Sequence, residues 1–316
     1  MSRIEPRGEA VDRAAANPYA GQVANTADPP IVAGLKELAP SYRALLCDVW
    51  GVVHNGVTSF APAIDALVRF REAGGVVALI TNAPRPKEPV LEQLAGLAVP
   101  DAAYDDVVTS GEAARDLLAN RSGLRILHVG PERDLALYDG LPVILTGEDD
   151  CDLVCCTGLV DDTVETPEDY AESLGRWRER RLPMLCVNPD IVVERGGEMV
   201  WCAGALAERY LEMGGETEVV GKPHPAIYTT ALARLATLIG IPDPASAVLA
   251  IGDGIDTDVR GAVARQLDVV FVTGGIHAAL FGDSASPDVV AVRAFLAKAG
   301  LGARALMPRL AWDFGS

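Results

Sequence analysis

Short apolar runs alternate along the chain with longer stretches in which apolar residues recur about every 3.6 positions. The short runs are typical of buried strands and lie at residues 44–49, 76–82, 105–110, 125–130, 152–158, 184–188, 247–253 and 268–275. The longer stretches predict helices at residues 61–75, 87–97, 167–181, 226–240 and 257–266. Strands and helices that alternate in this way form parallel sheets covered by helices. The pattern therefore predicts an α/β fold.

Length and charge narrow the range of structures and partners. A chain of 316 residues, 49% of them hydrophobic, can form two cores or one core with a large insertion. The net charge of −17 argues against nucleic acid and anionic membranes as partners, because both attract clustered Lys and Arg. Residues 1–30 are polar and contain four prolines, which predicts a loose N-terminal arm.

Neither a membrane span nor an export signal is expected. No apolar run approaches the roughly 20 residues that a transmembrane helix needs, and the first residues lack the apolar core of a signal peptide. The six cysteines have no paired metal spacing, so we expect buried thiols in a reducing compartment. Together these features predict a cytoplasmic protein.

Polar residues follow several of the predicted strands, at the sheet edge where α/β proteins place their chemistry. They are Asp48, Thr81 with Asn82, Asp253 and, five residues later, Asp258, and Lys222 stands before a predicted helix. Each alone is typical of a turn, a helix cap or a solvated charge. Together they form a coherent set: converging carboxylates need a cation, and oxygen ligands favour Mg²⁺ over zinc. A carboxylate can attack phosphorus, and an ammonium group can neutralise the charge.

Four segments in this order resemble the motifs of the haloacid dehalogenase superfamily: DVWGVVHNG (48–56), TNAPRP (81–86), GKPHP (221–225) and GDGIDTD (252–258). The long interval between the second and third motifs resembles the class IIA branch. Within it, TSGEAARDLL, VNPD and AGALAERYLE resemble NagD-like and 4-nitrophenylphosphatase-like members. The resemblance implies a Rossmann-like parallel-sheet core at 31–110 and 216–316, with an inserted α/β cap of the C2 type at 111–215.

The resemblance also implies roles for individual residues. Asp48 would be the nucleophile and a Mg²⁺ ligand, and Asp253 would be a second ligand. Lys222 would be the lysine of the third motif, and Asp258 would orient Lys222 or a metal-bound water. Asp256, between the two motif acids, is expected on the surface.

Four further residues would contact the substrate. Thr81 would bind phosphate through its hydroxyl and Asn82 through its backbone. Asn188 and Asp190 would reach the substrate from the cap, although an Asn-Pro-Asp sequence is equally typical of a simple turn.

Trp50 departs from the family pattern. Phosphatases of the superfamily carry an Asp two residues after the nucleophile; its carbonyl binds Mg²⁺, and its carboxyl protonates the leaving group and then activates water. Trp50 keeps the carbonyl, so it would remain a metal ligand, and lacks the carboxyl, whose function is worth about 10²–10⁴ in rate. The indole could pack in the core, narrow the pocket or stack on a substrate ring. His54 could supply the missing acid, or it could be a loop histidine bonded to backbone.

Three functions are consistent with these residues. The first is a Mg²⁺-dependent phosphatase that hydrolyses a small phosphomonoester, such as a sugar phosphate, through an aspartyl phosphate, with the missing acid supplied by water, substrate or a neighbour. The second is a regulatory protein that binds a phosphorylated ligand and has weak or no catalytic activity. The third is a dehalogenase, against which the retained GDGIDTD argues, because displacement at carbon needs no metal. The resemblance also allows for a homodimer formed through the cap.

Overall fold

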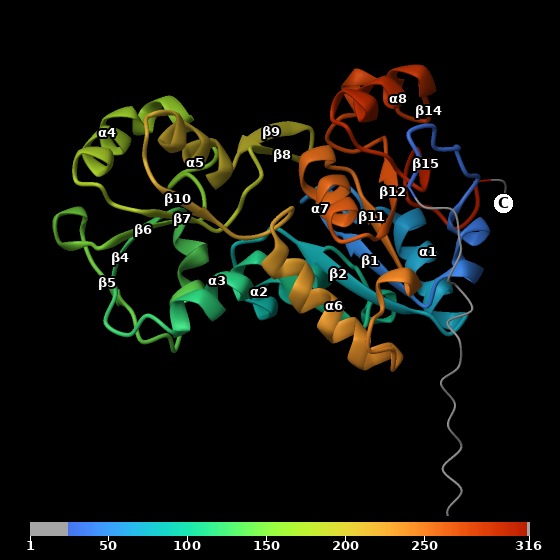
Figure 1. Ribbon diagram of the computed structural model, residues 1–316, viewed down its shortest axis with the longest axis horizontal. Coiled ribbons are helices and arrows are strands. Elements are labelled where there is room, and N and C mark those ends of the chain that lie inside the picture. Colours follow the sequence, from blue (N-terminus) through green and yellow to red (C-terminus); the bar gives the residue numbers. More distant parts are fainter. Residues whose placement is uncertain (1–24, 315–316) are drawn as a thin grey trace, which may run out of the picture.

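The computed structural model describes residues 25–314 and contains two parallel sheets, which lie in two units side by side (Figure 1). The strand order of the larger sheet is β15-β12-β11-β1-β2-β3, and that of the smaller is β10-β7-β6-β4-β5. Every pairing within these two sheets is parallel. The prediction of a Rossmann-like core with an inserted α/β unit is therefore confirmed.

The six-stranded sheet forms the core unit. Its strands are β1 (Ala44–Asp48), β2 (Val76–Thr81), β3 (Asp106–Thr109), β11 (Val248–Gly252), β12 (Asp268–Val272) and β15 (Ala305–Met307). Alternate residues of a strand face opposite sides: Leu45 and Cys47 pack in one hydrophobic layer, and Ala44 and Leu46 in the other. Helices α1 (Ala61–Glu72) and α2 (Lys87–Gly96) cover the first face, and α6 (Pro225–Ile239), α7 (Arg260–Ala264) and α8 (Val289–Lys298) cover the second.

We call the second unit the cap. Its sheet contains β4 (Arg125–Val129), β5 (Ile144–Leu145), β6 (Leu153–Cys156), β7 (Met184–Cys186) and β10 (Thr217–Val219). Helix α3 (Ser110–Ala119) packs on one face, and α4 (Ala171–Glu179) and α5 (Ala203–Glu212) pack on the other. An antiparallel hairpin, β8 (Val192–Arg195) with β9 (Glu198–Trp201), extends from the cap toward the core unit (Figure 1). A second antiparallel pair, β13 (Gly282–Asp283) with β14 (Ser286–Pro287), lies in the core unit.

Two details differ from the boundaries expected from the sequence. The expected second core segment starts at residue 216, yet β10 at Thr217–Val219 pairs with β7 of the cap sheet. Residues 25–30, assigned to a loose arm, run beside the edge strand β15: Thr26 and Ala303 exchange backbone hydrogen bonds, and Pro30 accepts one from Leu306. This segment satisfies backbone groups that an edge strand leaves open. The rest of the expected arm, residues 1–24, lies outside the described residues.

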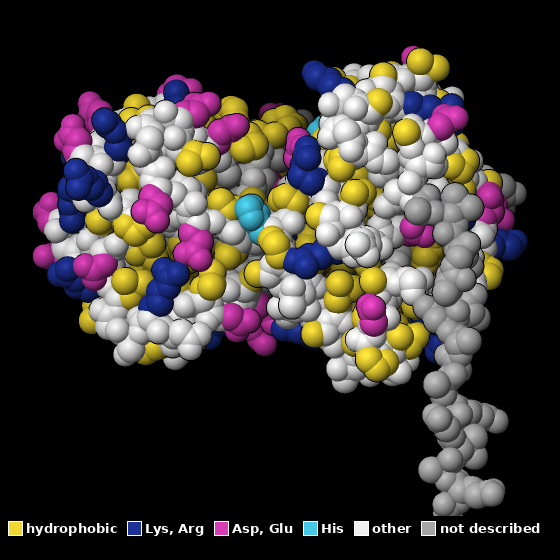
Figure 2. Space-filling model, viewed as in Figure 1, with side chains coloured by type: hydrophobic (Ala, Val, Ile, Leu, Met, Phe, Trp, Pro, Cys, Tyr) yellow, Lys and Arg dark blue, Asp and Glu magenta, His cyan; other side chains and the backbone are white. Residues whose placement is uncertain are grey.

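The cysteines, the charged surface and the length of the helices each bear on an expectation from the sequence. All six cysteines are buried free thiols. On the face shown in Figure 2, acidic and basic side chains are interspersed over both units instead of gathering into one basic surface. Between residues 25 and 314, the helices are too short or too polar to cross a bilayer.

Candidate active site

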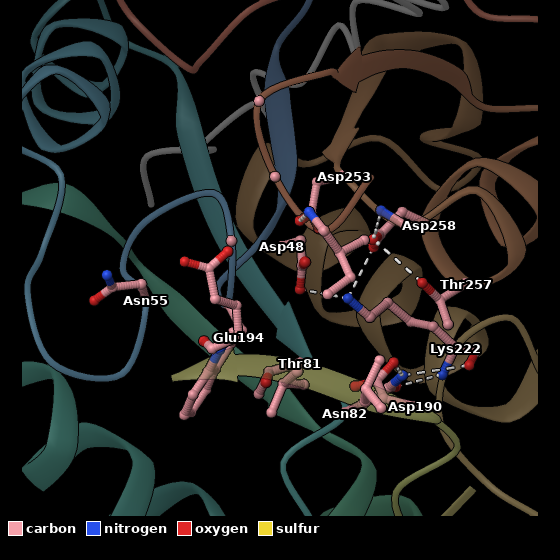
Figure 3. Close-up of a pocket in the computed structure, with 18 of the residues that line it drawn as sticks. Asp48, Asn55, Thr81, Asn82, Asp190, Glu194, Lys222, Asp253, Thr257 and Asp258 are labelled. Carbon is pink, nitrogen blue, oxygen red and sulfur yellow. Dashed lines mark hydrogen bonds and ion pairs between the residues drawn. The ribbon is translucent and has the colours of Figure 1, made fainter. Parts of the chain in front are cut away.

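The predicted site residues converge where the core sheet ends. Strands β11, β1 and β2 are neighbours in the sheet, so their carboxyl ends lie side by side. Asp48 is the last residue of β1, Thr81 is the last residue of β2, and Asp253 directly follows β11. Figure 3 shows these side chains around one pocket, together with Lys222 from the loop before α6. The cavity has a volume of about 220 Å³.

Lys222 is paired with two carboxylates at the bottom of this cavity. Its Nζ contacts Asp48 and lies 2.8 Å from Oδ1 of Asp258, and its side chain is 3% exposed. Burial alone lowers the pKa of Lys222, but the carboxylates of Asp258 and Asp48 outweigh burial and raise it well above its usual value. Lys222 is therefore a fixed positive charge beside Asp48.

The backbone before α7 places Asp258. A single π-helical turn, η8 (Ile255–Val259), follows Asp253, and such turns frequently occur at functional sites. The second oxygen of Asp258 accepts a hydrogen bond of 3.1 Å from the backbone N–H of Gly254. One carboxylate oxygen thus holds the turn while the other faces Lys222. By contrast, Asp256 is 74% exposed and pairs with Arg260, as expected of a surface residue.

The site has the ligands and the charge deficit of a Mg²⁺ site. Oxygens of Asp48, Asp253 and Asp258 lie within 4.8 Å of one another. Three carboxylates against one lysine leave a formal charge of −2, which a divalent cation would balance. Burial and Asp258 raise the pKa of Asp253 to about 7, and burial raises that of Asp48 well above its usual range. Buried oxygen donors of this kind suit Mg²⁺.

Gly51 lets the main chain pass close to these acids. Its φ of +83° favours glycine, and a Cβ at this position would lie 2.1 Å from Oδ2 of Asp253. The main chain next to Trp50 therefore passes close to the carboxylate of Asp253.

Asn82 links the core to the cap. Its Oδ1 accepts a hydrogen bond of 2.7 Å from the backbone N–H of Lys222, and its Nδ2 donates one of 2.9 Å to Asp190. The sequence suggests only a backbone role for Asn82, whereas its side chain positions two other site residues. Thr81 lines the cavity beside it, and its hydroxyl oxygen accepts from the N–H of Ala83 at 3.2 Å.

The two predicted cap residues, Asp190 and Asn188, differ in whether they line the cavity that contains Asp48. Asp190 is half-buried and lines the same cavity as Asp48; desolvation raises its pKa. The Oδ1 of Asn188 accepts from the N–H of Asp190 at 3.2 Å, which is the turn that the Asn-Pro-Asp sequence allows. Asn188 faces a neighbouring cavity and not the one that contains Asp48.

His54 is not placed to act as the missing acid. Its side chain is 2% exposed and lines neither cavity. Its Nδ1 accepts a hydrogen bond of 3.0 Å from Gly56, and its ring packs edge-on against Trp50 at 5.1 Å between centroids. Burial lowers its pKa to about 4, so the imidazole is neutral at neutral pH. The interpretation as a loop histidine bonded to backbone is the one that the structure supports.

Trp50 joins the first loop of the core to the hairpin of the cap. Its indole N–H donates a hydrogen bond of 2.7 Å to the backbone carbonyl of Glu194. The ring is half-buried and lies against Gly56, where a Cβ would approach it to 2.5 Å. Trp50 thus lines the cavity and anchors β8, a role that combines packing with narrowing of the pocket.

A second cavity of about 290 Å³ adjoins the first and shares five lining residues with it: Trp50, Thr81, Asn82, Asp190 and Val193. Besides Asp190, its lining includes three arginines and two further aspartates: Arg85, Arg133, Arg195, Asp134 and Asp162. Nη2 of Arg195 lies 2.8 Å from Asp162, and Nε of Arg85 lies 3.7 Å from Asp134. With Asp190, the three arginines and three aspartates of this cavity have a formal charge of zero, whereas carboxylates outnumber the single lysine in the first cavity.

Sequence reasoning missed this arginine group and the hairpin residues Val192, Val193 and Glu194 that close the first cavity. A signal for the hairpin exists. Gly196 and Gly197 separate two short β-type runs, and both have positive φ, as a two-residue hairpin turn requires.

Comparison with known proteins agrees with this geometry. Two family models match: "Haloacid dehalogenase-like hydrolase" at residues 45–141 and "HAD-hydrolase-like" at residues 219–294. These segments contain all four motifs and leave most of the cap unmatched. The D-glycerol 3-phosphate phosphatase of Mycobacterium tuberculosis is 32% identical over 256 residues, which are 78% of this chain and 67% of that protein.

Two solved structures extend the comparison. A haloacid dehalogenase-like hydrolase from Brucella suis is 49% identical with a TM-score of 0.80, covering 89% of this chain and all of that one. Glycerol phosphate phosphatase from Mycobacterium tuberculosis, solved in complex with magnesium, is 27% identical with a TM-score of 0.58, covering 76% of this chain and 70% of that one. The motifs, the fold and these relatives together show that the chain belongs to the haloacid dehalogenase-like hydrolases.

Proposed function

We propose that the protein is a Mg²⁺-dependent phosphatase that hydrolyses a small phosphomonoester through an aspartyl phosphate on Asp48. The observation that carries the proposal is the buried arrangement of Asp48 between Lys222 and the acids Asp253 and Asp258. A binding protein would not need a nucleophile, a fixed cation and a cation site in one cavity. The relatives named above as phosphatases of phosphorylated small molecules support the same reaction class.

The residues divide the work as follows. Asp48, Asp253 and the carbonyl of Trp50 would hold Mg²⁺, which when bound neutralises phosphate charge and orients the phosphoryl group. Lys222 neutralises charge on the nucleophile and the phosphoryl oxygens, and Asp258 keeps its ammonium group in place. The Thr81 hydroxyl and the Asn82 backbone would bind the remaining phosphate oxygens. The carboxylate of Asp48 then attacks phosphorus, and the alcohol leaves.

The cavities favour a small substrate with a polar leaving group. The volume of about 220 Å³ at Asp48 suits a phosphoryl group with a short organic portion. The second cavity can take the remainder, and its arginines and aspartates suit a hydroxylated group, which can both donate and accept hydrogen bonds. We propose the segment 111–215, together with β10, as the cap that covers this substrate.

Trp50 supports one alternative function. Its side chain has no carboxyl, and its N–H is occupied by the carbonyl of Glu194. If no other group transfers the proton, the protein would bind phosphorylated ligands and turn them over slowly or not at all, in a regulatory role.

A panel of phosphate esters, assayed with Mg²⁺ and with excess chelator, tests the proposal. We expect turnover of at least one small phosphomonoester with Mg²⁺ and its loss with chelator. Saturable binding of these esters without turnover would favour the regulatory alternative. Turnover that is unchanged by the chelator would contradict the metal-dependent mechanism.

A further inference from the structure

The β8–β9 hairpin is fixed to the loop that follows the nucleophile. The indole of Trp50 binds the carbonyl of Glu194 at 2.7 Å, and the N–H of Gly196 donates to the carbonyl of Asn55 at 3.1 Å. Gly196 has a φ of +60°, and a Cβ there would lie 2.7 Å from Val57. Two hydrogen bonds and a close backbone approach therefore hold Glu194 at a defined place over the core.

The side chain of Glu194 is directed into the cavity that contains Asp48. Figure 3 shows it projecting from the hairpin toward Asp48, and it lines the cavity. It is exposed, and its carboxylate has no hydrogen bond or ion pair with any of residues 25–314. A carboxylate that is held by its backbone and left free at its oxygens is available to a substrate.

The other ionisable groups of this cavity are already engaged. Lys222 is paired with Asp48 and Asp258, and Asp190 accepts a hydrogen bond from Asn82. Asp253 accepts a hydrogen bond of 2.7 Å from the N–H of Ile276 and belongs to the carboxylate cluster. Among those of residues 25–314 that line the cavity, Glu194 has the remaining carboxyl.

We propose that Glu194, supplied by the cap, performs the proton transfers for which Trp50 has no carboxyl. This inference rests on the proposed phosphatase function. Phosphoryl transfer places the attacking and leaving oxygens in line on opposite sides of phosphorus. Asp48 reaches the cavity from the end of the core sheet, and Glu194 reaches it from the cap hairpin. In the proposed arrangement the leaving oxygen departs toward Glu194.

The two steps balance as follows. In the first, an oxygen of Asp48 bonds to phosphorus, the P–O bond to the alcohol breaks, and the Glu194 carboxyl gives its proton to the departing oxygen. In the second, the Glu194 carboxylate takes a proton from water, the water oxygen bonds to phosphorus, and the bond to Asp48 breaks. Asp48, Glu194–H and phosphate result, so the enzyme returns to its starting state.

Glu194→Gln tests the proposal, because it keeps the size of the side chain and removes the transferable proton. We expect kcat for alkyl phosphates to fall by about 10²–10⁴-fold. With 4-nitrophenyl phosphate, whose leaving group needs little protonation, the first step should remain fast while the second is slow. Rapid mixing should then show a burst of about one nitrophenolate per active site, followed by slow turnover.

Glu198→Gln provides the matched control. Glu198 is exposed on β9 of the same hairpin, pairs in register with Arg195 and does not line either cavity. This variant should retain wild-type rates with both substrates and show the wild-type progress curve.

The outcomes separate this inference from the function on which it rests. A Glu194→Gln enzyme with the wild-type preference among leaving groups and no burst overturns the role of Glu194 and leaves the phosphatase proposal intact. A wild-type protein that hydrolyses no phosphomonoester overturns both. An equal loss of rate with alkyl and aryl esters and no burst also overturns the inference, since a purely structural role would produce it.

Discussion

The Nζ atom of Lys222 lies 2.8 Å from Oδ1 of Asp258 and also contacts Asp48, in a place where the lysine side chain is 3% exposed. Because the ammonium compensates two buried carboxylates, Lys222→Met should lower the free energy of unfolding by roughly 3–5 kcal/mol and remove activity. Denaturant titration without Mg²⁺ measures the first effect. Lys36→Met, at a side chain that is 64% exposed, is the control and should change little. A Lys222→Met protein as stable as the control would contradict the structural part of this prediction.

Asp48→Asn should abolish phosphatase activity while the fold remains intact, because a neutral amide neither attacks phosphorus nor binds Mg²⁺ well. Asp256→Asn makes the same substitution at a side chain that is 74% exposed, and it should keep wild-type kcat. Steady-state rates and circular dichroism of both variants provide the measurement. Turnover of Asp48→Asn within a few-fold of wild type would reject the aspartyl-phosphate mechanism.

Mg²⁺ should stabilise the protein, because a divalent cation removes repulsion among Asp48, Asp253 and Asp258. At 100 times its dissociation constant, Mg²⁺ should add about 2.7 kcal/mol to the free energy of unfolding. Asp253→Ala should weaken Mg²⁺ binding more than Asp258→Ala. Both oxygens of Asp258 are engaged, one with Lys222 and one with a backbone N–H, whereas Asp253 uses one oxygen to bind a backbone N–H. Calorimetric titration compares the two, and equal losses would count against Asp253 as the direct ligand.

His54 should make stability depend on pH between about 4 and 6.5. Burial lowers its pKa from 6.5 to about 4 in the folded protein. Within this window the unfolded chain binds a proton at His54 and the folded chain does not. The free energy of unfolding therefore falls by up to roughly 3 kcal/mol as the pH is lowered.

His54→Asn isolates this effect, because the amide oxygen can accept the hydrogen bond from Gly56 without titrating. Between about pH 7 and about pH 4.5 the variant should lose less stability than wild type. The raised pKa of Asp253 acts in the opposite direction, but it is present in both proteins and cancels in the comparison. Parallel curves for the two proteins would show that His54 is not responsible.

Much of the fold is predictable because both units are built from short apolar strands that alternate with amphipathic helices. The buried strands β1, β2, β6, β11 and β12 are short apolar runs, and all are found where the hydrophobic pattern predicts them. The polar residues at their ends converge because adjacent parallel strands end at one edge. Asp48, Thr81 and Asp253 follow from local sequence together with this rule.

The remaining features depend on contacts between distant segments. Nothing near Trp50 in the sequence indicates that its indole binds Glu194, 144 residues later. The sequence did not assign strand β10 to the cap. Its three residues, Thr217–Val219, are too few for a hydrophobic pattern to indicate which sheet they join. His54 looked available because it lies in a loop, but packing against Trp50 removes it from solvent.

The distribution of cysteines gives the protein a built-in reporter of local opening. Cys47 lies in β1 of the core, whereas Cys151, Cys155, Cys156, Cys186 and Cys202 lie in the cap. Burial raises the pKa of every one of them, that of Cys155 to about 12, so the native thiols hardly form the reactive thiolate. Alkylation of a given thiol therefore marks a moment when its own unit has opened. Mass spectrometry of slowly alkylated protein would time the fluctuations of the two units separately, without dyes or engineered labels.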